Sequence, residues 1–119
     1  MVELTKRERR LTSFPTRKIT EEEARKSLSR AVANIQIAWY ELEQAKLELN
    51  NAISHLRDSY SLHNTERLER ASKWVHSANK RYYQRRSDLS VVKDGCYESE
   101  IPSYIVKEYT EVLEKCENS

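Results

Sequence analysis

The sequence predicts an all-α fold: a long antiparallel helical hairpin, packed like a coiled coil, with a short C-terminal helix and a short N-terminal helix or arm. The 119 residues include one glycine and two prolines, too few for the tight turns of a β-sheet protein. Apolar residues recur at alternating spacings of three and four, the period of packed helices. Charged residues make up 34% of the chain and hydrophobic residues 38%, a balance typical of narrow helical bundles.

Residues 1–19 form the first predicted unit, a basic arm or short helix. Thr5 and Glu8 have the spacing of a helix-capping pair, which favours a helix start. Phe14 precedes Pro15 and is therefore biased toward extended backbone, so the helix is expected to end there.

The first helix of the hairpin is predicted over about residues 20–60. Thr20 and Glu23 form a second capping pair, and glutamates in the first turn complement the positive end of a helix. A heptad series of apolar residues follows, with Leu28 at position d and Val32 at position a, interrupted only by Lys46. The members of this series are Leu28, Val32, Ile35, Trp39, Leu42, Leu49, Ile53, Leu56 and Tyr60. No proline or glycine breaks the series, so the helix should be about 60 Å long.

A column of alanines runs beside the heptad series, one at every g position. Its members are Ala24, Ala31, Ala38, Ala45 and Ala52. Because alanine has no side chain beyond Cβ, the column lets a neighbouring backbone approach closely and widens the buried stripe. We expect this helix to contact more than one neighbour. The alternative is that alanine serves only as a strong helix former.

The second helix of the hairpin is predicted over about residues 65–93, after a turn of about six residues. Asn64 is the expected N-cap, and Gly95 is the expected left-handed residue that ends the helix. The apolar stripe of this helix contains Leu68, Ala71, Val75, Ala78, Tyr82, Leu89 and Val92, with Arg85 interrupting it. A short connection between long helices implies antiparallel neighbours, so the hairpin should span residues 20–94.

Residues 95–119 are predicted to carry an acidic C-terminal helix that begins near Pro102. We expect its apolar face to contain Ile105, Tyr109, Val112 and Cys116. The two cysteines, Cys96 and Cys116, are expected to be thiols rather than a disulfide.

The two predicted hairpin helices differ in length by about 15 Å, which leaves Leu28 and Val32 in need of a cover. The third helix, the N-terminal arm or another subunit are the three candidates. Trp74, at a flanking g position, is expected to be half exposed beside cationic residues, where an aromatic side chain can anchor an interface. The alternative is that Trp74 packs along the edge of the bundle. The candidate partner interface therefore consists of Leu28, Val32 and Trp74.

The sequence offers no recognisable catalytic or metal-binding pattern. One glycine cannot build a loop that cradles phosphates. His55, His63 and His76 lack the spacing of four that lets one helix face hold a metal ion. We therefore expect no enzyme activity, no metal ion and no other cofactor.

Charge is unevenly distributed, although the net charge is only +2. Residues 1–18 carry +4 and residues 19–65 carry −2, whereas residues 66–93 carry +5 and residues 94–119 carry −5. The basic zones suggest nucleic-acid binding as an alternative function, since cations contact phosphates and tyrosines stack on bases. The candidates are Lys6, Arg7, Arg9, Arg10, Arg70, Lys73, Lys80, Arg81, Arg85 and Arg86. The favoured interpretation is a solvated face whose cations pair with the acidic C-terminal helix.

The expected function is thus that of a non-enzymatic helical protein-protein interaction module, which binds a protein partner or self-associates. Size and composition suit a small accessory or regulatory protein of a bacterium or phage, by analogy alone. No stretch has the apolar length of a membrane span or a secretory signal, so we expect a cytoplasmic protein with no membrane partner. No small-molecule substrate is predicted.

Overall fold

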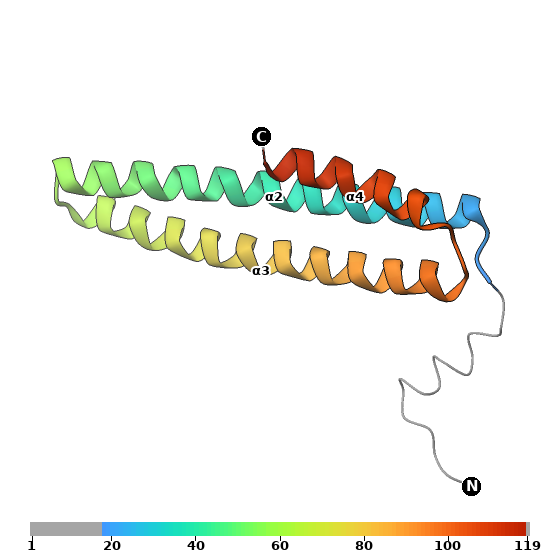
Figure 1. Cartoon of the computed structure of the whole chain (residues 1–119). Coiled ribbons are helices and arrows are strands. Elements are labelled where there is room, and N and C mark those ends of the chain that lie inside the picture. Colours follow the sequence, from blue (N-terminus) through green and yellow to red (C-terminus); the bar gives the residue numbers. More distant parts are fainter. Residues whose placement is uncertain (1–17, 119) are drawn as a thin grey trace, which may run out of the picture.

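The computed structural model describes residues 18–118, and all of its regular elements are α-helices (Figure 1). Helix α2 spans Glu21–Asp58, α3 spans Leu62–Glu98 and α4 spans Ser103–Glu117. The helices α2 and α3 run antiparallel as a long hairpin, and α4 packs alongside α2. The predicted all-α hairpin with a short C-terminal helix is confirmed. The predictions for residues 1–17 fall outside the described residues.

Helix α2 begins where the capping pair predicts. The Thr20 hydroxyl accepts the backbone N–H of Glu23 at 3.1 Å and lies 3.3 Å from the Glu23 carboxylate. The five alanines of the g column are all buried. Because α2 contacts both α3 and α4, the expectation of more than one neighbour is confirmed.

The turn between the long helices is shorter than predicted. Ser61, not Asn64, is the N-cap of α3, and its hydroxyl accepts the backbone N–H of Asn64 at 3.1 Å. The Asn64 side chain instead donates to the carbonyls of His55 and Ser59, at 3.3 and 2.6 Å. The His55 carbonyl also accepts the backbone N–H of Ser59 at 2.9 Å, so Asn64 adds a second hydrogen bond there and bonds the Ser59 carbonyl just past the end of α2. Because Ser61 is the N-cap, α3 begins at Leu62.

Gly95 does not end α3, which continues to Glu98. The apolar stripe extends to the buried Cys96, and one glycine costs a helix only about 1 kcal/mol, so packing outweighs the penalty. The left-handed residue is Glu100, with φ 60°. The Glu100 N–H donates to the Tyr97 carbonyl and the Ile101 N–H to the Cys96 carbonyl, which is the Schellman pattern of a helix end.

These corrections make α2 and α3 nearly equal, at 38 and 37 residues. The predicted length mismatch of the hairpin is therefore wrong. None of the helices within residues 18–118 is long and apolar enough to cross a membrane.

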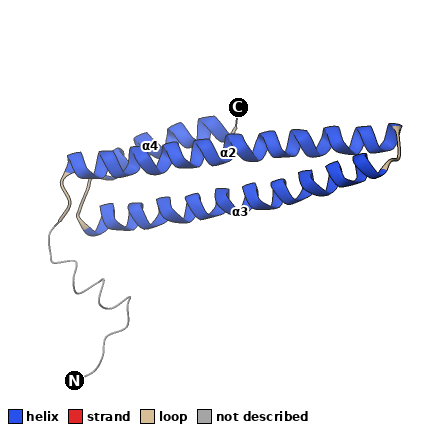
Figure 2. Ribbon diagram, turned by 180° about the vertical axis from the view of Figure 1, so that it is seen from behind, coloured by secondary structure: helices blue, strands red, loops and turns tan. Residues whose placement is uncertain are grey.

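Helix α4 covers only one end of the hairpin. It lies in front of α2 in Figure 1 and behind α2 in Figure 2, so it occupies one side of the hairpin plane. The buried residues of α4 are Ile105, Val106 and Leu113. Val112 is exposed, because α4 turns Leu113 rather than its neighbour toward α2.

Two parts of the molecule follow from this arrangement. The three-helix half consists of residues 18–38 and 78–118, where α2, α3 and α4 pack together. The two-helix half consists of residues 39–77, which includes the turn between α2 and α3. The main core belongs to the three-helix half and comprises eleven buried residues, among them Leu28, Ile35, Leu89 and Ile105. The second core cluster holds only Leu42, Ala45 and Ala78.

Candidate interaction surface

One face of the two-helix half is closed by hydrogen bonds and ion pairs between α2 and α3; we call it the ion-paired face. Glu41 pairs with Arg81 and accepts the indole N–H of Trp74 at 3.3 Å. Glu48 pairs with Arg67 at 2.8 Å. The hydrogen bond from Arg81 lowers the pKa of Glu41, and the hydrogen bond from Arg67 lowers the pKa of Glu48. Both carboxylates are therefore charged at neutral pH.

The opposite face of the two-helix half is apolar. Trp39 lies two residues before Glu41, which turns it about 160° around α2 from the ion-paired face. Ile53 shares the heptad position of Trp39, and Leu68 and Val75 occupy the corresponding positions on α3. We call this surface the apolar face and define it by Trp39, Leu49, Ile53, Leu56, Leu68 and Val75.

The apolar face lies on the side of the hairpin that α4 covers elsewhere. Val32 occupies the same heptad position as Ile53, yet it is buried in the cluster that contains Ile105 and Val106 of α4. Arg25, also at this position, pairs with Glu108 of α4 at 3.0 Å. The apolar face is thus the continuation of the surface on which α4 rests.

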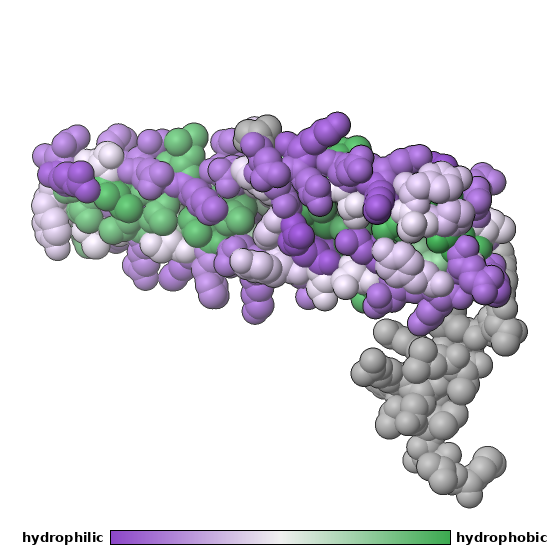
Figure 3. Space-filling model, in the orientation of Figure 1, coloured by the Kyte–Doolittle hydropathy of each residue, from purple (hydrophilic) through white to green (hydrophobic). Residues whose placement is uncertain are grey.

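Within residues 18–118, no helix covers the apolar face. Ile53 is 38% exposed, and the other five members of the face are each partly accessible to solvent. Figure 3 shows the hydrophobic surface as a green band along the part of the hairpin beyond α4. A pair of helices buries only the line where they touch, so a continuous apolar strip stays open beside it.

Polar residues at the edge of the apolar face carry little net charge. Asn50 and Ser72 are exposed, uncharged and placed four residues after Lys46 and Leu68. Lys46, which interrupts the heptad series, pairs with Glu43 at 3.5 Å. The edge carries few charges, among them Arg57 and the Lys46–Glu43 pair, and so suits another apolar helix surface better than a charged polymer.

The three residues predicted as a partner interface do not lie together. Leu28 and Val32 are covered, as predicted, and both are buried in the three-helix half, so neither is open to a partner. The third helix supplies the cover. Trp74 is 38% exposed and lies on the ion-paired face, beside a shallow hollow lined by Glu48, Arg67, Arg70 and Ala71. The part of the heptad series that stays accessible to solvent consists of later members, such as Leu49, Ile53 and Leu56.

Most of the basic candidates on α3 have an acidic partner. Arg81 pairs with Glu41, Arg86 with Glu117 at 2.7 Å, Arg85 with Asp88 at 3.3 Å, and Lys73 with Glu69 at 3.4 Å. Only Arg86 pairs with α4; the remaining partners lie on α2 or on α3 itself. Lys6, Arg7, Arg9 and Arg10 lie outside the described residues.

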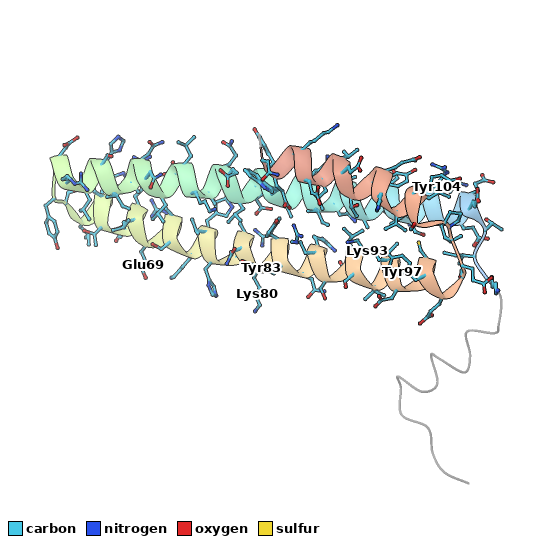
Figure 4. All side chains as sticks on the ribbon, in the orientation of Figure 1. Glu69, Lys80, Tyr83, Lys93, Tyr97 and Tyr104 are labelled. Carbon is cyan, nitrogen blue, oxygen red and sulfur yellow. The ribbon has the colours of Figure 1, made fainter. Side chains whose placement is uncertain are left out.

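Lys80 and Arg70 are exposed, and neither forms an ion pair within residues 18–118. Figure 4 shows Lys80 on the side of α3 that faces away from α2. Lys80 borders a shallow hollow with His76 and Tyr83, and the Tyr83 side chain is 63% exposed. Among the described nucleic-acid candidates, Lys80 and Arg70 on this outer surface of α3 are therefore the ones without an ion pair within residues 18–118.

The described residues contain no group of three or more histidines, cysteines, aspartates or glutamates placed to hold a metal ion. Cys96 and Cys116 are both free thiols, as predicted, and burial raises the pKa of Cys96. Comparisons with family models, curated proteins and solved structures give no match to this chain.

Proposed function

We propose that this chain is a non-enzymatic helical interaction module, with an accessory or regulatory role, that binds a helical protein surface through the apolar face. The observation that carries the proposal is the exposed apolar face around Ile53. It lies on the side of the hairpin that α4 covers in the three-helix half. A helix packed there would bury the strip as α4 buries Val32.

Hydrophobic burial favours binding at the apolar face. Burial of apolar surface contributes about 25 cal/mol per Å², so three partly exposed leucines in line with Ile53 provide a substantial driving force. The ion pairs on the opposite face are partly accessible to solvent, and solvent-accessible pairs contribute only about 0 to 1 kcal/mol each. The apolar face is therefore the stronger candidate for binding.

Site-specific photocross-linking tests the proposal, with adjacent asparagines as a matched pair. Asn50 borders the apolar face, whereas Asn51 lies about 100° further around α2. A benzophenone amino acid at position 50 should form protein adducts in a lysate of the source cells, and the same amino acid at position 51 should form few. Equal adduct yields at both positions, or none at position 50, would contradict the proposed binding face.

Nucleic-acid binding through Lys80, Arg70 and Tyr83 is the alternative function, supported by the exposed cations on the outer surface of α3. Phosphate contacts release counterions, so affinity for DNA or RNA would fall steeply with salt. We expect no binding tighter than about 1 µM at physiological salt. Submicromolar binding that weakens with salt, and loses about one unit of log-log slope in Lys80→Ala, would favour the alternative.

A further inference from the structure

We propose that the occupant of the apolar face is a second copy of this chain, bound face to face and antiparallel about a two-fold axis near Lys46 and Leu49. This inference rests on the proposed function and names the partner. Four properties of the two-helix half carry it: the position of α4, the length of the face, its charge and its area.

The position of α4 selects the antiparallel arrangement. Helix α4 stands on the same side of the hairpin as the apolar face and ends at Glu117, beside Tyr82 and Arg86. If two copies met face to face in parallel, their α4 helices would occupy the same space. In the antiparallel arrangement each α4 lies beyond the turn of the other hairpin, and the two open strips meet.

The length of the apolar face fits this arrangement. From Trp39 to Asp58 the face is about 30 Å long, and it runs from the end of α4 to the turn of the hairpin. An antiparallel second copy centred near Lys46 and Leu49 therefore places its Ser59–Ser61 turn against the end of α4. Helix α4 and the partner hairpin then form one continuous layer over α2.

The charge of the two-helix half permits two identical surfaces to meet. Residues 39–77 contain five basic and six acidic side chains, so the net charge of this half is only −1. Lys46, which meets its own counterpart near the axis, is partly neutralised by Glu43 at 3.5 Å. The paired glutamates Glu41 and Glu48 lie on the ion-paired face, away from the contact. An isologous interface needs this kind of self-complementary, nearly neutral surface.

The area of the face predicts a weak dimer. Two helices side by side are about 20 Å wide, so the contact covers about 600 Å² on each copy. That total of about 1,200 Å² lies at the lower limit of specific interfaces, where dissociation constants of about 10 to 100 µM are expected.

Sedimentation equilibrium of the purified full chain tests the dimer, with two isoleucines as a matched pair. Ile53 lies on the apolar face, whereas Ile37 is 67% exposed on the outer side of α2. The average mass should rise toward twice the chain mass with concentration in the wild type and in Ile37→Asp. It should stay at the monomer mass in Ile53→Asp, with the helical circular dichroism spectrum retained.

A substitution at Lys46 should strengthen the dimer, and so tests the contact without a disruptive change. Lys46→Leu fills the one polar gap in the heptad series and should tighten the dimer at least about tenfold, because a leucine replaces a charged group at the contact. An unchanged dissociation constant would place Lys46 outside the contact and overturn the proposed axis.

Disulfide trapping tests the antiparallel geometry. With the axis between Lys46 and Leu49, Lys46→Cys should form a disulfide-linked dimer under mild oxidation, whereas Arg57→Cys, about 30 Å from its own counterpart, should not. Efficient trapping of both would indicate a parallel dimer and contradict the proposal.

The outcomes also separate this inference from the proposed function. A wild-type chain that stays monomeric at about 0.5 mM, well above the expected dissociation constant, overturns the dimer. If position 50 nevertheless cross-links to another protein, the interaction module stands with a different partner. A monomer that forms no adducts at position 50 contradicts both.

Discussion

The two halves of the hairpin have the same heptad pattern but bury it to different depths. In the three-helix half, Leu28, Val32 and Ile35 are buried between α3 and α4. In the two-helix half, Leu49, Ile53 and Leu56 belong to the same series and stay partly accessible to solvent. A heptad pattern therefore identifies a surface that packs against helices, but the number of helices around it decides how much is buried.

Ion pairs occur in both halves, but they join different helices. In the three-helix half, Arg25 pairs with Glu108 and Arg86 pairs with Glu117, so these pairs join α4 to α2 and to α3. Two further pairs link α2 to α3 along the ion-paired face: Glu48 with Arg67 within the two-helix half, and Glu41 with Arg81 at its boundary. These pairs align the helices where the apolar contact between them is narrow. The difference indicates that polar contacts set the register of the two-helix half, while apolar burial provides the stability of the three-helix half.

Matched leucine substitutions should give the largest difference between the halves. Leu28 and Leu56 both occupy d positions of α2, but only Leu28 is buried. Leu28→Ala should lower the free energy of unfolding by about 3 to 4 kcal/mol, whereas Leu56→Ala should lower it by about 1 to 2 kcal/mol. Denaturant unfolding at low protein concentration measures both. Equal losses would mean that the halves do not differ in burial as described.

Acid titration should reveal a smaller effect, confined to the ion-paired face. Since Arg81 lowers the pKa of Glu41 in the folded state, the charged carboxylate stabilises the fold above its unfolded pKa of about 4.3. That contribution is lost as the pH falls through the lower folded pKa. The stability difference between the wild type and Glu41→Gln should therefore shrink below about pH 4.3. A difference that stayed constant into strong acid would show that Arg81 does not stabilise the carboxylate.

Truncation of an unpaired cation should have the smallest effect. Arg70 is exposed on α3 and forms no ion pair within residues 18–118. Arg70→Ala should change the free energy of unfolding by less than about 0.5 kcal/mol, whereas Leu42→Ala, in the small core of the two-helix half, should cost about 2 to 4 kcal/mol. Denaturant melts that gave similar losses for both would reject the heptad assignment of α2.

Sequence periodicity predicted the fold more completely than it predicted the interaction surface. The capping pair at Thr20 and the heptads of α2 depend on neighbours along the chain, so local patterns are sufficient to find them. The end of α3 depends on tertiary packing of Cys96 and Ile101, which outweighs the local preference of Gly95 for a helix end. The sequence pattern therefore placed the helix end too early.

The location of the apolar face was not predicted from the sequence, for a related reason. The boundary predicted for α3 made the second helix too short, and this false difference in length placed the uncovered residues at Leu28 and Val32. A usable signal was nonetheless present, because a C-terminal helix of about 14 residues covers about 21 Å and cannot reach the far end of a hairpin of about 60 Å. That comparison of lengths predicts that residues near Ile53 stay uncovered by the C-terminal helix.

Hydrogen exchange at two protein concentrations tests the central claim, that a second copy covers the apolar face. The amides of residues 47–58 should exchange more slowly at about 200 µM than at about 1 µM, because dimerisation suppresses local opening of the two-helix half. The amides of residues 24–35, which α4 covers in every copy, should exchange equally at both concentrations. Identical exchange of residues 47–58 at the two concentrations would contradict the account.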